Sequence, residues 1–208
     1  MTRRFYDLAF TPAVRAEQVR RGSRASYAAI TANTGDDAAA DVLSQREVAF
    51  IAARDTFYLA SVSESGWPYV QHRGGPPGFV RALDEETLGW ADFAGNRQYV
   101  SVGNTATDDR VAMIFMDYSH RQRLKVLGHM RVYDAGSRPD LAPQLGVEDY
   151  KARVERFILI TVEAFDWNCP QHITPRFTLP ELEKLVAPLH VRIAELESQL
   201  ETCEPSLG

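Results

Sequence analysis

Short runs of strand-forming residues, separated by turn residues, constrain the fold of this chain more than any other feature. Thr56–Val62 is β-branched and aromatic, and the turn-forming segment Glu64–Gly66 separates it from the next extended run. After a Gly/Pro loop at Gly74–Gly78, two more apolar runs, Phe79–Leu83 and Thr87–Phe93, flank a short acidic turn at Asp84–Glu86. Consecutive strands joined by short turns, without regular βαβ alternation, favour an antiparallel barrel over a doubly wound parallel sheet.

Three later runs complete the expected sheet. Arg110–Asp117 is almost continuously apolar, as a central strand would be, whereas Gln122–Asp134 alternates more openly. Gly128 falls inside the second of these runs, where a missing side chain permits a β-bulge or a close backbone approach. Phe157–Phe165 supplies a last buried strand. We therefore expect about six strands in a mainly antiparallel β fold.

Helices are expected around this barrel. Thr11-Pro12 has the pattern of an N-cap followed by proline and opens a short polar helix, and the capping box Ser44–Glu47 opens a helix from about 44 to 54. Residues 22–40 predict a mostly irregular arm, in which Tyr27 and Ile30 can anchor a helical turn. A helical turn is predicted at 97–104 and a short helix at 147–154, after a loop at 135–146 that is rich in glycine and proline.

The C-terminal part reads as a separate helix. Thr178–Glu181 repeats the capping box, and apolar residues then recur at alternating spacings of three and four: Leu182, Leu185, Leu189, Ile193, Leu196 and Leu200. Pro188 is expected to bend or interrupt the helix early. Two partners remain open for the apolar stripe, a second subunit or the barrel of the same chain.

Composition excludes several functional classes. The net charge of -5 and the pI near 5.6 argue against non-specific nucleic-acid binding, which needs a basic surface. No apolar run approaches the roughly 20 residues that span a bilayer, and the first residues lack a signal-peptide pattern, so we expect a cytoplasmic protein. Cys169 and Cys203 are expected to be reduced. Cys169 and His172 have the spacing of half a zinc site, but no second pair follows, so no metal is assigned.

Two arginines flank the hairpin in the first half of the chain. Arg73 ends one strand, and Arg97 follows the strand that ends at Phe93. Their paired N–H groups match the oxygens of a phosphate, so the two guanidinium groups form a candidate phosphate site. The alternative is that both arginines merely solvate strand ends.

Five segments together resemble the pyridoxamine 5'-phosphate oxidase-related, FMN-binding split-barrel superfamily. They are FYLASVSESGWPYVQHRGG, LGWADFAGNRQYVSVGN, RVAMIFMDY, RQRLKVLGHMRVY and FDWNCPQHITPRF, and they cover roughly residues 44–177. The resemblance implies a six-stranded split β-barrel with flanking α-helices and a C-terminal helix. It divides the chain into an N-terminal helix and arm (1–43), the FMN-binding split-barrel domain (44–177) and a C-terminal helix and tail (178–208). It also implies a homodimer with FMN at the subunit interface.

The resemblance further implies the residues that hold FMN. The strand residues expected along the isoalloxazine ring and ribityl chain are Val70, Gln71, His72, Arg73, Ala91, Asp92 and Phe93. Asn96, Arg97 and Gln98 occupy the place of the family's phosphate turn, with Arg97 as the main ligand and Gln98 in place of the usual lysine.

Other implied contacts come from the second subunit. Gln122 or Arg123 is expected to approach the flavin, and the choice between them stays open. Trp167, Gln171 and His172 lie in the segment that closes over the ring in related chains. We assign no catalytic acid or base.

We therefore expect an FMN-dependent oxidoreductase that acts on a small molecule, with NADH, NADPH or oxygen as its redox partner. The Arg-rich C-terminal pattern of the true oxidase is absent, which argues against pyridoxamine phosphate as substrate. The alternatives are a non-catalytic flavin-binding or storage protein, or a split barrel that uses F420 or haem; haem would need His129 or His172 as axial ligand.

Overall fold

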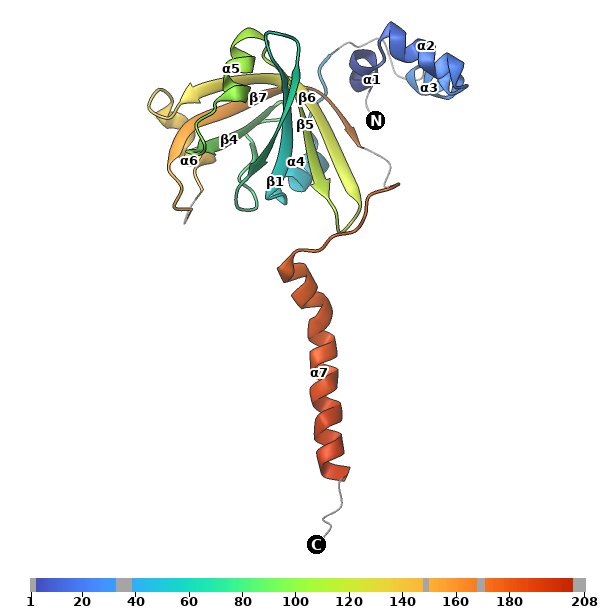
Figure 1. Cartoon of the computed structure of the whole chain (residues 1–208), viewed down its shortest axis with the longest axis vertical. Helices are drawn as coiled ribbons and strands as arrows, with labels where there is room; N and C mark the ends of the chain where they lie inside the picture. The colour runs from blue at the N-terminus through green and yellow to red at the C-terminus, as the bar shows by residue number, and fades with distance from the viewer. Residues whose placement is uncertain (1–2, 33–38, 148–149, 168–170, 204–208) are drawn as a thin grey trace.

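The computed structural model describes residues 3–32, 39–147, 150–167 and 171–203. Its centre is one antiparallel sheet of seven strands in the order β2-β1-β5-β6-β7-β4-β3 (Figure 1). The strands are β1 (Thr56–Val62), β2 (Pro68–Gly74), β3 (Arg81–Ala82), β4 (Thr87–Phe93), β5 (Arg110–Asp117), β6 (Gln122–Asp134) and β7 (Val154–Trp167). The predicted fold class is confirmed, and β3, within the predicted run Phe79–Leu83, is only two residues long.

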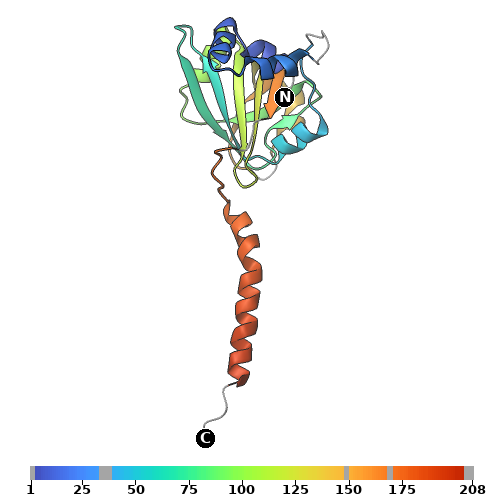
Figure 2. The same cartoon turned by 90° about the vertical axis from the view of Figure 1, so that its right-hand side faces the viewer.

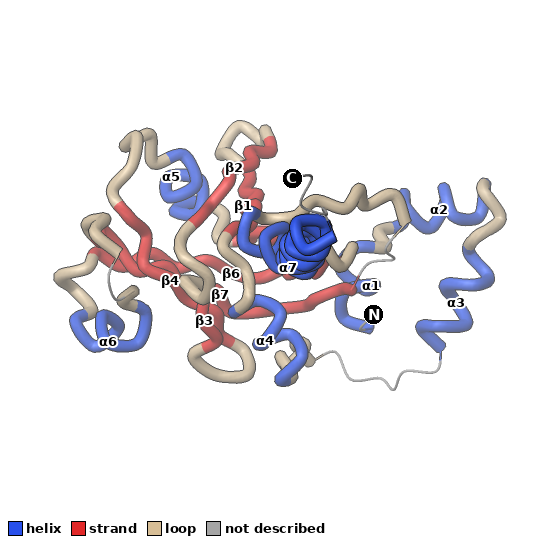
Figure 3. Tube along the Cα trace, turned by 90° about the horizontal axis from the view of Figure 1, so that it is seen from below, coloured by secondary structure: helices blue, strands red, loops and turns tan. Residues whose placement is uncertain are grey.

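Seven α-helices flank the described part of the sheet. They are α1 (Arg3–Ala9), α2 (Pro12–Arg20), α3 (Arg24–Ala32), α4 (Gln45–Ala52), α5 (Val100–Thr107), α6 (Ala142–Leu145) and α7 (Leu179–Cys203), with a 3-10 turn at Pro139–Leu141 before α6. The predicted caps at Thr11 and Ser44 are present, and Ser44 and Glu47 form the complete capping box. Figure 3 shows α1–α3 toward one end of the sheet and α5 and α6 toward the other end, on opposite sides of β4.

Two helix predictions were wrong. Within the arm predicted to be irregular, residues 24–32 form α3, because Tyr27 packs against Phe10 and Tyr6 with ring centroids 5.2 and 6.0 Å apart. The described residues of 147–154 are not helical, and β7 begins at Val154. The helical turns lie earlier, in the segment predicted to be a loop, because Pro139 stands at the start of a turn, where its missing N–H costs nothing.

The sheet curls until strands that are distant in its order meet across the core. Phe57 on β1 contacts Trp90 on β4 with ring centroids 5.1 Å apart, although β5, β6 and β7 lie between their strands. Phe79 and Phe115 pack on the same Phe57 ring. These four aromatic side chains are almost completely buried. The aromatic core therefore fixes the curvature that brings β2 close to β4.

Helix α5 is fastened to the first two strands by side-chain hydrogen bonds. The Ser101 hydroxyl donates to Oε1 of Gln71 on β2 at 3.0 Å, and Nδ2 of Asn104 donates to Oγ of Ser61 on β1 at 3.0 Å. The predicted helical turn at 97–104 is therefore a helix that begins three residues later. Its N-terminal end faces the loop that follows β4.

Gly128 forms the predicted irregularity in β6. The register between β6 and β7 shifts between Leu127 and Gly128. A Cβ atom at Gly128 would lie 2.4 Å from the carbonyl oxygen of Thr161. The backbones of the two strands therefore approach so closely that no side chain fits, as the sequence suggested.

Helix α7 extends away from the sheet, with the C-terminus at its far end (Figures 1 and 2). The predicted capping box is present, since Glu181 accepts hydrogen bonds from the backbone N–H and the hydroxyl of Thr178. Pro188 does not interrupt the helix, contrary to expectation, because the chain around it remains helical from Leu179 to Cys203. None of the helices in the described ranges has the length and apolarity needed to cross a bilayer.

Candidate functional site

A small cavity opens where β2, the loop after β4, the start of α5 and the start of β7 meet. Its volume is about 180 Å³. Its walls combine three arginines with polar and aromatic side chains: Gln71, Arg73, Phe93, Gly95, Asn96, Arg97, Tyr99, Val102, Glu155 and Arg156. We call it the arginine cavity.

A buried carboxylate fixes two of the arginines. Oδ1 of Asp92 accepts a hydrogen bond from Nη1 of Arg73 at 2.6 Å, and its Oδ2 accepts from Nη2 of Arg156 at 2.7 Å. Only 4% of the Asp92 side chain is exposed, against 16% for Arg73 and 13% for Arg156. Burial lowers the pKa of Arg156, but the hydrogen bond to Asp92 and the nearby negative charges outweigh this effect and raise it above the usual arginine value. Asp92 therefore holds both guanidinium groups in place.

Tyr99 links the third arginine to this network. The Tyr99 hydroxyl donates to Oε1 of Glu155 at 3.0 Å and accepts a longer contact of 3.5 Å from Nε of Arg97. The hydrogen bond to Tyr99 raises the pKa of Arg97. Glu155 in turn pairs with Arg156 at 3.0 Å, and the Arg156 guanidinium lies over the Tyr99 ring at 4.7 Å. A continuous chain of polar contacts thus connects Arg97 to Asp92.

The loop that carries Arg97 has an unusual backbone. Arg97 and Tyr99 both have left-handed conformations, with φ of 61° and 53°. The side-chain oxygen of Asn96 accepts from the Gln98 backbone N–H at 3.2 Å and so closes a local turn. Left-handed residues other than glycine cost about 1–2 kcal/mol each and concentrate at functional sites. This loop therefore holds Arg97 at the cavity mouth at an energetic cost.

The charge balance of the cavity favours an anion. Three guanidinium groups face two carboxylates, Asp92 and Glu155, which leaves one net positive charge. Nε of Arg73 is buried and has no hydrogen-bond partner among the described residues. Arg97 is exposed, and among the described residues its side chain has only the long contact with Tyr99. Two donors therefore remain for the oxygens of a bound anion.

The sequence-predicted residues divide into those that meet at this cavity and those that do not. Five of them line it: Gln71, Arg73, Phe93, Asn96 and Arg97. A sixth, Asp92, does not line the cavity but binds the guanidinium of Arg73. Gln98 is exposed and does not line the cavity. Ala91 is buried on the other face of β4, in a small cluster with Leu141 and Phe157.

The remaining predicted strand residues lie elsewhere. Val70 and His72 alternate with Gln71 and Arg73 along β2 and are exposed, and the His72 ring contacts Tyr58 with centroids 5.6 Å apart. Gln122 and Arg123 begin β6, away from the cavity. Nε of Arg123 is buried without a hydrogen-bond partner among the described residues.

Trp167 is held by its own chain. Its Nε1 donates to Oε1 of Glu47 on α4 at 2.6 Å, and its ring packs edge-on against Phe50 at 4.7 Å. Gln171 and His172 follow it as exposed residues, and His172 has a left-handed φ of 63°. Residues 168–170, which include Cys169, lie outside the described ranges.

Sequence reasoning missed three polar members of the cavity, Tyr99, Glu155 and Arg156, besides Gly95 and Val102. Glu155 and Arg156 stand at the start of β7, just before its apolar run, where charged residues commonly end a strand. The hydrogen bond from Arg156 to Asp92 spans 64 residues of sequence, so no local pattern could have indicated it.

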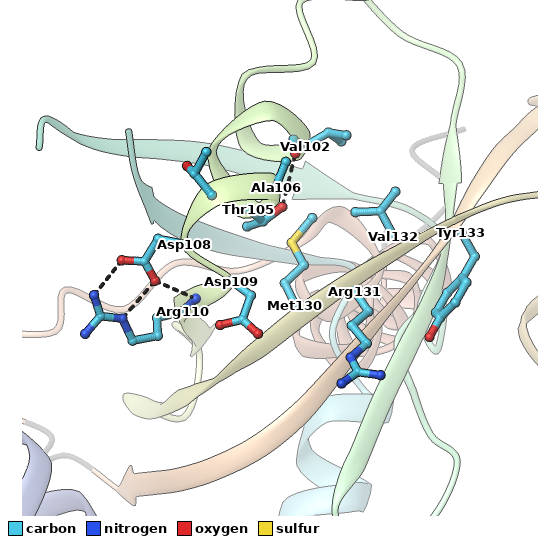
Figure 4. Close-up of a pocket in the computed structure, with 11 residues that line it drawn as sticks. Val102, Thr105, Ala106, Asp108, Asp109, Arg110, Met130, Arg131, Val132 and Tyr133 are labelled. Carbon is cyan, nitrogen blue, oxygen red and sulfur yellow. Dashed lines mark hydrogen bonds and ion pairs between the residues drawn. The ribbon is translucent and has the colours of Figure 1, made fainter. Parts of the chain in front are cut away.

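A larger hollow lies beside α5, between this helix and β6 (Figure 4). Its volume is about 910 Å³. Its charged groups pair locally, since Arg110 donates to both carboxylate oxygens of Asp108 at 2.8 and 2.5 Å. This pairing lowers the pKa of Asp108 to about 2. None of the residues predicted from the sequence lines this hollow, and the arginine cavity is the better candidate.

Comparisons with known proteins point to one family. A family model described as pyridoxamine 5'-phosphate oxidase matches residues 43–168, more than half of the chain. No curated protein matches the chain in a sequence search.

Among solved structures, HupZ from Group A Streptococcus is 14% identical with a TM-score of 0.45, and the match covers 65% of this chain and 99% of HupZ. General Stress Protein 26 from Bacillus anthracis is 13% identical with a TM-score of 0.44, covering 64% and 95%. A pyridoxamine 5'-phosphate oxidase-related, FMN binding protein from Nostoc punctiforme is 14% identical with a TM-score of 0.38, covering 54% and 73%. The extent of the family-model match identifies the chain as a member of the pyridoxamine 5'-phosphate oxidase family.

Proposed function

We propose that this protein binds FMN, with the phosphate of the cofactor in the arginine cavity, and acts as an FMN-dependent oxidoreductase. The observation that supports this most directly is the convergence of Arg73, Arg97 and Arg156 on one cavity of about 180 Å³. A phosphate monoester has the charge and the oxygen acceptors that such a cluster needs. Membership of the pyridoxamine 5'-phosphate oxidase family supports a flavin over other phosphate esters.

The residues present fit the phosphate of FMN. Arg97 offers an exposed guanidinium, and the buried Nε of Arg73 lacks a partner among the described residues. Asn96 adds a short polar side chain on the same wall. Asp92 keeps Arg73 and Arg156 oriented, so that little side-chain entropy is lost when an anion binds.

When bound, the isoalloxazine ring supplies hydride and electron transfer through N5. The protein then has to bind the cofactor, orient it and exclude water. Gln71 is already held by the Ser101 hydroxyl, which fixes the side chain next to Arg73 on β2. Gln122 or Arg123 is proposed to approach the ring from a second subunit and to stabilise the negative charge of the reduced flavin.

A second subunit fits the outer face of the sheet. Tyr58, Val62 and Val70 on β1 and β2 expose 37%, 39% and 61% of their surface. Next to them an apolar hollow of about 190 Å³ is lined by residues that include Ile114 and Leu127. Apolar patches of this kind mark association surfaces. We propose that a homodimer forms through this face and that NADH, NADPH or oxygen is the redox partner.

The substrate is proposed to be a small molecule other than pyridoxamine phosphate. This follows from the sequence after Trp167, which lacks the Arg-rich pattern of the true oxidase.

The first experiment is an absorption spectrum of the purified full chain, with mass analysis of what denaturation releases. Flavin bands and released FMN are expected. A colourless protein that takes up no added FMN would contradict the proposal, as would a chain that instead releases F420 or haem. Rapid bleaching of the bound flavin by NADH or NADPH, followed by reoxidation with an acceptor, would separate an oxidoreductase from a flavin-storage protein.

A further inference from the structure

Helix α7 carries an apolar stripe whose side chains are exposed along most of its length. Leu189, Ile193 and Leu200 expose 61%, 51% and 68% of their surface. Among the described residues, the start of α7 meets the turn between β5 and β6, where Oε1 of Glu181 accepts a hydrogen bond from the Ser119 hydroxyl at 2.8 Å. A long amphipathic helix gains most of its stability from packing of its apolar face, so a partner for this face is needed.

The stripe follows a heptad repeat that spans the whole helix. If Leu179 is assigned position a, the a positions are Leu179, Val186, Ile193 and Leu200. The d positions are then Leu182, Leu189, Leu196 and Cys203. The two central a positions are β-branched, and three of the four d positions are leucine. This combination favours two-stranded parallel coiled coils.

The register also explains how Pro188 is tolerated. Pro188 falls at position c, on the face opposite the a/d seam. The helix continues through it without interruption. The proline therefore costs a backbone hydrogen bond but leaves the seam intact.

The charges that flank the seam match a second copy of the same helix. Arg192 stands at position g and Glu197 at position e of the next heptad. In a parallel, in-register pair, a g residue faces the e residue of the next heptad on the partner helix. Arg192 of one copy would then face Glu197 of the other, twice in a symmetric pair. Within one chain Arg192 pairs with Glu195 at 2.9 Å, an exposed contact that is easily exchanged.

A membrane surface fits this helix poorly. From Leu179 to Cys203 the sequence contains five glutamates against one lysine and one arginine. Helices that lie on membranes usually carry lysine and arginine on their polar face, because lipid surfaces are anionic.

We propose that α7 pairs with α7 of a second copy of this chain as a parallel, in-register, two-stranded coiled coil. The coil joins two subunits independently of any flavin and adds an interface outside the sheet. This proposal does not rest on the proposed function, because its evidence is confined to α7.

The test is a distance measurement on the full chain between spin labels. Cys169 is first replaced by serine and Cys203, which lies at position d, by the apolar residue alanine; single labels are then placed at Ser198→Cys or Lys184→Cys, both at position f on the outer face. With helix axes about 8–10 Å apart, a parallel in-register pair should give a similar distance at both sites, short because it is set by the width of the pair and not by the length of the helix. In an antiparallel pair, the two labels at one site are also displaced from each other along the helix axis. Summed over the two sites, these axial displacements come to at least about 42 Å, so at least one of them reaches about 21 Å.

Two matched variants show whether the a/d seam is responsible. Ile193→Asp places a charge at position a, and Val191→Asp places the same charge at position f on a residue that is similarly exposed, 60% against 51%. We expect the short distance to be lost in Ile193→Asp and retained in Val191→Asp. Flavin content should be the same in both variants.

Three outcomes would overturn the proposal. They are a monomeric parent chain in sedimentation equilibrium, the absence of a defined short distance in the parent, and an equal response of the two aspartate variants. Distances that differ between the two label sites by the antiparallel offset would overturn the parallel arrangement.

Discussion

The guanidinium of Arg73 on β2 donates to Oδ1 of Asp92 on β4 at 2.6 Å, although four strands separate β2 from β4 in the sheet. This contact closes the curled sheet at the end that carries the arginine cavity. Arg156, on the strand next to β4, binds the other carboxylate oxygen. One buried carboxylate therefore supports both the closure of the fold and the positive charge of the candidate site.

Replacing Asp92 with asparagine should destabilise the fold. The change leaves two largely buried guanidinium groups next to each other without their shared carboxylate. Removing one partner of a buried ion pair costs about 3–5 kcal/mol, and the partial exposure of both arginines places the expected loss near the lower end. Urea unfolding of the full chain, followed by circular dichroism, measures the free energy of unfolding.

Asp140→Asn is the matched control for that variant. Asp140 also pairs with an arginine, Arg138 at 2.7 Å, but this pair is exposed on a loop. Exposed pairs contribute at most about 1 kcal/mol. Equal losses in the two variants would show that the Asp92 pair does not close the sheet in solution.

Arg97→Ala should weaken FMN binding without affecting stability. Arg97 is exposed, and its one side-chain hydrogen bond within the described ranges is the long contact with the exposed Tyr99, so its removal leaves no buried group of these ranges unpaired. A hydrogen bond to a charged group is worth about 1.5–3 kcal/mol, which predicts a dissociation constant raised about tenfold to a hundredfold. Titration of flavin-free protein with FMN, followed by quenching of flavin fluorescence, gives this constant.

Arg138→Ala controls for the loss of one exposed positive charge. Its pair with Asp140 lies outside the arginine cavity, so affinity for FMN should stay within about twofold of the parent. If Arg97→Ala binds FMN as tightly as Arg138→Ala does, the phosphate does not lie against Arg97.

Local sequence patterns predicted the elements that local chemistry determines. The capping boxes at Ser44 and Thr178 mark real helix starts, because the cap and the glutamate three residues later bind each other directly. Gly128 marked a real bulge, since only the absence of a side chain permits the contact with Thr161. Each of these signals is contained in a few adjacent residues or in one residue type.

The parts that sequence reasoning missed depend on contacts between distant segments. In residues 22–40 the sequence predicted no more than a helical turn anchored by Tyr27 and Ile30, whereas the packing of Tyr27 on Tyr6 of α1 and on Phe10 stabilises the longer helix α3. Arg156 enters the arginine cavity because β7 pairs with β4 in a particular register, with Arg156 opposite Asp92. A sequence gives the residue types at such positions, but the register follows only from the assembled sheet.

Gly128→Ala should be strongly destabilising, whereas Gly103→Ala should be neutral or stabilising. A Cβ at Gly128 would lie 2.4 Å from the Thr161 carbonyl oxygen, which belongs to backbone that cannot move aside. Overpacking of this kind costs about 1–3 kcal/mol or more. A Cβ at Gly103 in α5 meets no atom within 4 Å, and alanine in a helix is favoured over glycine by about 1 kcal/mol. Thermal unfolding of both variants tests the pair, and a Gly128→Ala protein as stable as Gly103→Ala would exclude the close strand approach.

The contact between Glu47 and Trp167 should make stability depend on pH. Burial raises the pKa of Glu47, but hydrogen bonds from Ser44 and Trp167 outweigh it and lower the pKa below the usual glutamate value of 4.5. A carboxylate with a lowered folded pKa stabilises the fold above about pH 4.5, and this contribution is lost as pH falls through the folded pKa. Glu47→Gln should therefore lower the free energy of unfolding by about 1.5–3 kcal/mol at pH 7, and the difference should shrink below pH 4.5. Urea unfolding followed by tryptophan fluorescence measures the free energy of unfolding at each pH.

Glu64→Gln is the control, because Glu64 lies in an exposed turn, and this variant should show no such difference from the parent. A Glu47→Gln difference that stays constant down to pH 3 would mean that the charge of Glu47 contributes nothing to the contact with Trp167.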